Sequence, residues 1–210
     1  MPLMQLVPPS IEPLTVAEAK NFCKSDTDLV DDDALFGLLI TSARVYAEAY
    51  TARSFISQQW RLVMDSFPGN MMQAVPWGRT FSLPGNAILL ERAPVISVDS
   101  ITYTDMGGAQ QTVPSSEYVA DLSGPMPRIT PGFGKIWPIT LPQIGAAAAN
   151  FTAGYGSTAA SVPAGIRDCL LMRVKSRYDM RGEVTVASRG KIEPLPWVDA
   201  LLDPYRVPSL

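Results

Sequence analysis

The sequence contains no histidine among its 210 residues. Histidine is the usual general base near neutral pH and the commonest metal ligand, so its absence removes several kinds of chemistry at once. Ser-His-Asp and Cys-His nucleophiles are excluded, and so are zinc sites of the HExxH type. We therefore expect no catalytic site, no metal site and no cofactor in this chain.

Cysteine, long apolar runs and basic charge are scarce as well. Cys23 and Cys169 fall in predicted helices far apart in the sequence, which favours two buried thiols over a disulfide. No run is long and apolar enough to span a bilayer, and the start MPLMQLVPPS lacks the basic end and apolar core of a signal peptide. The net charge of -3 argues against a protein that grips nucleic acid, because such proteins carry a basic excess.

Helical signals dominate the first quarter of the chain. Residues 1–13 contain four prolines and predict an extended arm, because proline removes a backbone donor and blocks helix formation. Thr15 is expected to begin a helix that runs to about Cys23, since Glu18 completes a capping box. The acidic run at residues 31–33 is better explained by favourable charge at the start of the next helix than by a cation site, because it lacks the ligand pattern of an EF-hand.

The second helix is expected over residues 33–51. Its apolar residues cover more than half of the helical circumference, which predicts packing on more than one side, against helices of the same chain or against an adjacent subunit. Arg44 and Glu48 form an i,i+4 pair that we expect on its exposed face.

The pattern changes to short β-strands over residues 57–154, where proline, glycine and aspartate separate apolar segments. Residues 102–104 and 111–113 are expected to form a hairpin around Gly107 and Gly108. We predict an α+β fold, in which a small helical bundle carries an inserted antiparallel sheet or sandwich. The predicted parts are an extended arm (1–13), a helical domain (14–56 and 161–182), an inserted β domain (57–154) and a C-terminal docking tail (183–210).

Two features near the C-terminus leave alternatives open. Arg173, Arg177 and Arg181 lie beside the apolar stripe of the third helix, where they either form a solvated face or pair with another chain. Residues 197–206 (WVDALLDPYR) form one or two helical turns, too short to be stable alone. This segment must dock either on its own domain or on a partner, for which aromatic and arginine anchors are well suited.

A set of short segments follows in a fixed order along nearly the whole chain. The segments are PLTVAEAK (13–20), DDAL (32–35), ARVYAEAYT (43–51), Ile56 with Gln58, Trp60 and Leu62, FTAGYG (151–156), VP (162–163), RYDMRGE (177–183) and LLDPYR (201–206). This ordered set resembles the head–tail connector (adaptor) proteins of tailed phages and of related gene-transfer particles, in the branch with a β insertion between the helices. Two features depart from that pattern: Gly37 interrupts the second helix where a larger residue is expected, and residues 66–88 form a loop of their own.

The resemblance implies a structural virion protein of the neck, made in the bacterial host cytoplasm. It would form a ring beneath the portal and extend the DNA channel. The implied partners are the portal protein, copies of itself, a downstream neck (stopper) or tail protein, and double-stranded DNA that passes without specific binding; no membrane is implied. The residues expected to dock on the portal are Trp197, Leu201, Leu202, Tyr205 and Arg206. The residues expected at the subunit interface are Arg44, Glu48, Arg173, Arg177 and Arg181.

Two other classes of protein compete with this interpretation. The rings of Trp60, Trp77 and Trp137 could stack on sugars, which would suit a β-rich carbohydrate- or ligand-binding accessory module of the tail, although core packing is the simpler role. A hydrolase that uses carboxylates alone would need two of them at a defined separation, which the sequence does not reveal.

Overall fold

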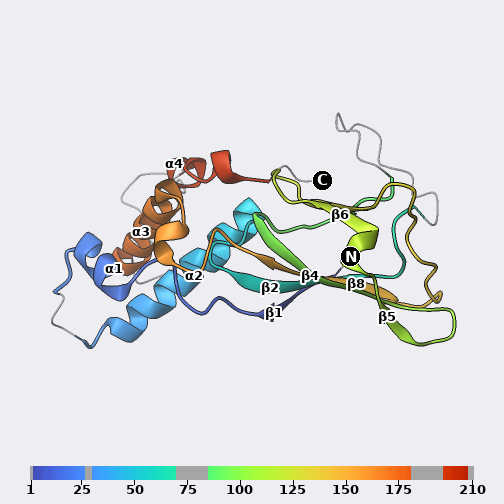
Figure 1. The fold of residues 1–210 in the computed structure, drawn as a ribbon. Coiled ribbons are helices and arrows are strands. Elements are labelled where there is room, and N and C mark those ends of the chain that lie inside the picture. The colour runs from blue at the N-terminus through green and yellow to red at the C-terminus, as the bar shows by residue number, and fades with distance from the viewer. Residues whose placement is uncertain (1, 27–29, 70–84, 181–195, 208–210) are drawn as a thin grey trace, which may run out of the picture. The chain divides into compact units, whose positions relative to one another are not determined.

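The computed structural model describes residues 2–26, 30–69, 85–180 and 196–207, with side chains from residue 198 onward in the last range (Figure 1). The fold is α+β, with helices and antiparallel sheets, which confirms the predicted class. The chain divides into a β-rich unit (residues 1–8 and 57–154) and a helical unit (residues 9–56 and 155–210). It therefore passes between the two units three times.

The helical unit begins with a capped helix. The backbone N–H of Glu18 donates to Thr15 Oγ1 over 3.1 Å, and the Thr15 N–H donates to the Glu18 carboxylate over 2.8 Å, so the expected capping box is present. The helices of this unit are α1 (Val16–Cys23), α2 (Asp33–Thr51), α3 (Ala164–Asp179) and α4 (Pro196–Ala200), with short 3-10 turns at Ala159–Ser161 and Asp203–Tyr205.

One face of α2 packs against α1 and α3 to form the core of the helical unit. Phe36 is fully buried, and its ring stacks on Tyr178 of α3 with the centroids 4.6 Å apart. Each large apolar side chain buried here contributes about 1.5 to 3 kcal/mol. The largest fully buried members of this core are Phe36, Ile40, Phe55, Ile56 and Ile166.

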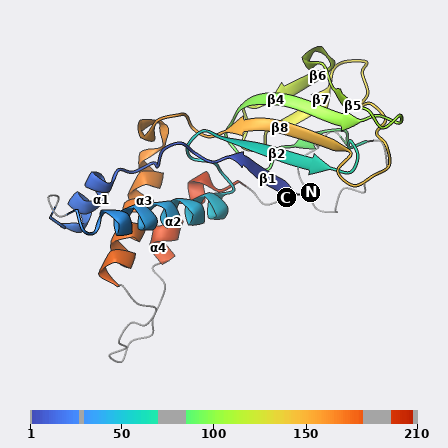
Figure 2. The same cartoon turned by 90° about the horizontal axis from the view of Figure 1, so that it is seen from below.

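The β-rich unit contains a five-stranded sheet in the order β1-β2-β8-β4-β5 and a three-stranded sheet in the order β3-β7-β6, both antiparallel (Figure 2). Alternate side chains of β2 are buried, as expected for a strand with one face on a core. The strands are β1 (Leu3–Val7), β2 (Gln58–Met64), β3 (Ile88–Leu89), β4 (Val95–Thr104), β5 (Gln110–Thr112), β6 (Tyr118–Asp121), β7 (Arg128–Pro131) and β8 (Ala147–Ala153).

The predicted hairpin is confirmed as β4 and β5. The Asp105 carboxylate accepts from the backbone N–H groups of Gly107 (2.8 Å) and Ala109 (3.0 Å), while Gly108 adopts a positive φ of 82°. A residue with a Cβ is strained in that conformation, which explains the glycine. Residues 70–84 of the predicted β region lie outside the described residues.

The proline-rich start is extended, as expected, but residues 3–7 pair with β2 and close one edge of the sheet. Leu3 lies opposite Leu62 and Gln5 opposite Trp60. This pairing could not be predicted, because the segment LMQLV lacks apolar–polar alternation. Met4, Leu6 and Val7 are exposed in the structure. Edge strands tolerate flanking prolines, which explains why this segment is bounded by Pro2 and Pro8.

Candidate docking and assembly surfaces

The C-terminal segment (residues 198–207) is held on α2 and α3 within the helical unit. Leu202 is fully buried and Val198 is nearly so, and both belong to the core of this unit. The backbone N–H of Val207 donates to the Thr51 carbonyl oxygen at the end of α2 over 2.9 Å. The sequence left open whether this segment docks on its own domain or on a partner. For Val198 and Leu202 the structure assigns it to its own domain.

Two tyrosines of α2 bind two aspartates of the C-terminal segment. Tyr50 Oη donates to Asp203 Oδ1 over 2.7 Å, and Tyr46 Oη donates to Asp199 Oδ2 over 3.3 Å. The two tyrosines are four residues apart, and so are the two aspartates. One helical turn of α2 therefore places both hydroxyl groups at the spacing of the two carboxylates. Sequence reasoning missed this pairing, although the shared spacing of four was a signal that could have suggested it.

The five residues expected to dock on a portal differ in their accessibility. Leu202 is buried in the chain's own core, and the side chain of Trp197 lies outside the described residues. Leu201 and Tyr205 are half-buried, and Arg206 is exposed with its guanidinium 5.3 Å from the centre of the Tyr50 ring. A partner could therefore reach Leu201, Tyr205 and Arg206, but not Leu202.

The prediction of an exposed Arg44–Glu48 pair is wrong. Each residue is only 7% exposed. Arg44 donates through Nε to Glu12 over 2.7 Å and through Nη1 to Glu48 over 2.9 Å, while Glu48 accepts the Phe55 N–H over 2.8 Å. The helical wheel could not reveal this network, because Glu12 and Phe55 reach it from outside the helix. A pair buried in this way is not presented to a neighbouring copy.

The three arginines of the third helix also differ from one another. Arg173 pairs with Asp199, and its guanidinium lies 3.6 Å from the centre of the Tyr46 ring, so it stabilises the C-terminal segment of its own chain. Arg177 is exposed and donates to Ser42 of α2. Arg181 lies outside the described residues. Of the two arginines that the structure describes here, Arg177 is the more accessible to another chain.

The side of α2 that points to solvent carries no charged side chain from Ala34 to Ala49. We call this surface the outer face of α2; it comprises Ala34, Leu38, Thr41, Ser42, Val45 and Ala49. Leu38 is 66% exposed and Val45 is 54% exposed. A solvated helical face normally carries charged residues, so an uncharged face four turns long indicates a contact surface.

The acidic run before α2 is engaged in contacts within the chain. Asp32 accepts from Tyr178 Oη over 2.8 Å, and Asp33 pairs with the buried Lys20. Asp32 occupies the N-cap position, but its side chain makes no capping hydrogen bond because it is turned toward Tyr178. No group of three His, Cys, Asp or Glu residues in the described part of the chain is placed to hold a metal ion.

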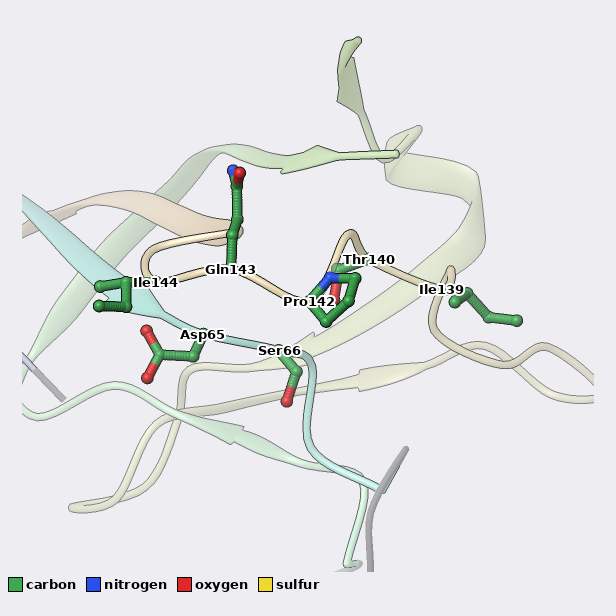
Figure 3. Close-up of a pocket in the computed structure, with 7 residues that line it drawn as sticks. All are labelled: Asp65, Ser66, Ile139, Thr140, Pro142, Gln143 and Ile144. Atoms are coloured by element: carbon green, nitrogen blue, oxygen red, sulfur yellow. The ribbon is translucent and has the colours of Figure 1, made fainter. Parts of the chain in front are cut away.

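A pocket of about 500 Å³ lies at the end of β2 in the β-rich unit (Figure 3). It is lined by Asp65, Ser66, Ile139, Thr140, Pro142, Gln143 and Ile144. Asp65 Oδ1 accepts the Gly145 N–H over 2.8 Å, and no other carboxylate is among the described lining residues. Glycosidase chemistry needs two facing carboxylates, and the described lining residues supply one of them.

The tryptophans that could have stacked on sugars are core residues where they are described. Trp60 is 9% exposed and Trp137 is 3% exposed. Trp137 stacks on Phe67 with ring centroids 4.9 Å apart and donates through Nε1 to the Asn86 carbonyl oxygen over 2.6 Å. Trp77 lies outside the described residues. The two described rings are thus not presented to a carbohydrate.

Both cysteines are free and buried, and burial raises the pKa of Cys169 to about 11. Only the thiolate reacts with disulfide reagents, so we expect almost no labelling of the folded protein by DTNB at pH 8 and labelling of both thiols after denaturation. The measurement is the absorbance of released thionitrobenzoate with and without guanidinium. A fast-reacting thiol in the folded protein would contradict the buried placement.

No protein-family model and no curated protein sequence matches this chain. Solved structures of gene transfer agent (GTA) particles do match it over 100% of this chain and 97% of theirs. A chain in the virion of the native GTA particle has a TM-score of 0.76 at 22% identity. Chains in the neck of the empty particle computed with C6 symmetry and in the neck of the native particle computed with C12 symmetry have TM-scores of 0.74 and 0.63, at 23% and 22% identity.

This likeness shows that the chain shares the fold of a GTA particle component along its whole length. None of the helices described is long and apolar enough to cross a membrane.

Proposed function

We propose that this chain is a structural protein of the neck of a phage-like particle, an adaptor that forms a ring beneath the portal. In that role it extends the DNA channel and joins it to the next neck or tail protein, and it performs no catalysis. The observation that carries the proposal is the full-length likeness to a chain in GTA necks, two of whose structures are described with sixfold and twelvefold symmetry.

The surfaces of the helical unit support a role in assembly. The outer face of α2 is uncharged and exposes Leu38 and Val45, which suits contact with a further protein surface. The accessible part of the C-terminal segment offers Tyr205 and Arg206, residue types that are enriched in the energetically dominant parts of interfaces. We assign portal docking to these two residues and to Leu201.

The net charge of -3 is consistent with a channel through which DNA slides, because a protein with few phosphate contacts binds DNA weakly. The experiment for the whole proposal is native mass spectrometry of the purified protein, alone and mixed with its cognate portal ring. We expect a complex with several copies per portal ring. A protein that stays monomeric and does not bind the portal ring would refute the proposal.

The portal contact has its own test. Arg206→Ala should weaken portal binding about tenfold or more, as is typical for arginine at a central interface position. Lys135→Ala, which removes an exposed charge from the β-rich unit, serves as the matched control and should bind like the wild type. Equal binding by both variants would remove the C-terminal segment from the portal interface.

A further inference from the structure

Gly37 lies at the edge of the outer face of α2, one turn from Thr41, and nothing in its own unit explains a glycine there. A Cβ built on Gly37 would meet no heavy atom within 4 Å. Glycine in the interior of a helix is less favourable than alanine, so the position carries a penalty without a reason inside the chain. Small residues in helical faces allow another backbone to approach closely, and the missing side chain therefore points to a neighbour outside the chain.

A second apolar surface lies at one end of the helical unit. Tyr178 Oη donates to Asp32 over 2.8 Å, and Asp179 and Lys175 of α3 act electrostatically on Cys23, so the end of α3 lies beside the end of α1 and the start of α2. Three exposed side chains belong to this end, which we call the end patch: Phe22 (37% exposed), Val30 (71%) and Met180 (57%).

The charges at the two surfaces are complementary. The outer face of α2 is bordered by the exposed Arg177, which donates to Ser42 within that face. Glu12 also borders it and accepts from Thr41 over 3.0 Å, but its charge is paired with Arg44, so among the described residues Arg177 supplies the unpaired charge there. The residues near the members of the end patch in the sequence have an acidic excess: Asp26, Asp31, Asp32, Asp33 and Asp179 stand against Lys20, Lys24 and Lys175. Asp33 is paired with Lys20 and Asp179 with Lys175, so the excess comes from the remaining aspartates.

We propose that the outer face of α2 in one copy packs against the end patch of the next copy, with Gly37 allowing the close approach. The proposal rests on the ring assembly proposed above. A ring needs a head-to-tail contact, in which each copy contributes two different surfaces. Of the seven exposed large apolar residues in the described part of the helical unit, five belong to these two surfaces and the other two are Ile11 and Tyr46. The five are Phe22, Val30, Leu38, Val45 and Met180.

The test uses one variant in each surface, Leu38→Glu and Val30→Glu. Both residues are more than half exposed, so the folded monomer should tolerate the change. Each variant alone should require at least about a tenfold higher concentration to assemble, because the contact would bury an unpaired charge. Mixed together they should form a dimer and nothing larger, since one intact outer face then meets one intact end patch. Analytical ultracentrifugation, with and without the portal ring, measures these species.

Three results would overturn the pairing. Assembly of Val30→Glu like the wild type would show that the end patch is not used, and the absence of a mixed dimer would show that the two surfaces do not meet. Normal assembly of Leu38→Glu would show that the outer face of α2 is not part of the contact between copies. Ala164→Glu is the control, because it adds the same charge at an exposed position of α3 and should assemble normally. Failure of the wild type itself to assemble, alone or on the portal, would instead refute the proposed function.

Gly37→Ala should affect the stability of the monomer and the strength of assembly in opposite directions. The substitution should raise the Tm of the monomer by about 2 to 4 °C, because alanine favours the helix and the added Cβ meets nothing. The same substitution should weaken assembly, because the added methyl group holds the neighbour away. A raised Tm with unchanged assembly would show that no chain approaches Gly37.

Discussion

Replacing Arg44 with alanine is expected to lower the free energy of unfolding by about 3 to 5 kcal/mol, the loss typical of breaking a buried charge pair. Arg44 donates to both Glu12 and Glu48, and its side chain is 9% exposed. Its removal leaves the Glu48 carboxylate buried, with the Phe55 N–H as one remaining donor. Because Glu12 precedes α1 and Phe55 follows α2, the loss should loosen both ends of the first helical hairpin.

Urea denaturation followed by circular dichroism measures this loss. Lys175→Ala is the matched control, because the Lys175–Asp179 pair is also spaced i,i+4 but is 40% and 50% exposed. Exposed pairs of this kind contribute only about 0.3 to 0.5 kcal/mol. If Arg44→Ala were no more destabilising than Lys175→Ala, Glu48 would have to reach water, and the buried network would not hold.

Leu202→Ala should destabilise the protein by about 2 to 5 kcal/mol, as is usual for a leucine truncated in a closed core. Leu202 is fully buried with α2 and α3, whereas the neighbouring Leu201 is half-buried. Leu201→Ala is therefore the matched control and should cost clearly less, although it should weaken portal docking. Chemical denaturation of both variants measures the two losses in the free energy of unfolding and shows which is larger.

This prediction changes how truncations should be interpreted. Deleting residues 190–210 would remove not only the accessible Arg206 but also two buried side chains, Val198 and Leu202. Portal binding lost by such a deletion could then reflect an unfolded helical unit. A Leu202→Ala variant as stable as the wild type would show instead that the segment is dispensable for the core.

Local signals were sufficient to predict the α+β class, the capping box of α1 and the β4–β5 hairpin. Thr15 with Glu18, and Asp105 with Gly107, act over three residues or fewer, so their spacing in the sequence fixes their geometry. The apolar periodicity of α2 likewise predicted packing on more than one side; one side is buried against α1 and α3, and contact on the outer face stays a prediction.

Contacts between distant residues could not be predicted in the same way. Glu12 reaches Arg44 across 32 residues, and Asp203 reaches Tyr50 across 153. A helical wheel places Arg44 on a polar face. It considers only residues of the helix itself, so it cannot predict that Glu12 binds Arg44 from another segment. The pairing of β1 with β2 was missed for a similar reason, since the partner strand lies more than 50 residues further along the chain.

The three crossings between the units bear on the order of folding during synthesis. The β-rich unit has all its strands once residue 153 is made, whereas the apolar face of α2 must wait for α3 and Leu202. At translation rates of about 5 to 20 residues per second, that wait lasts on the order of ten seconds. Phe36 and Ile40 are without their final partners throughout this interval. The helices that are made first are therefore the last to be covered, and they are the part most exposed to aggregation on the ribosome.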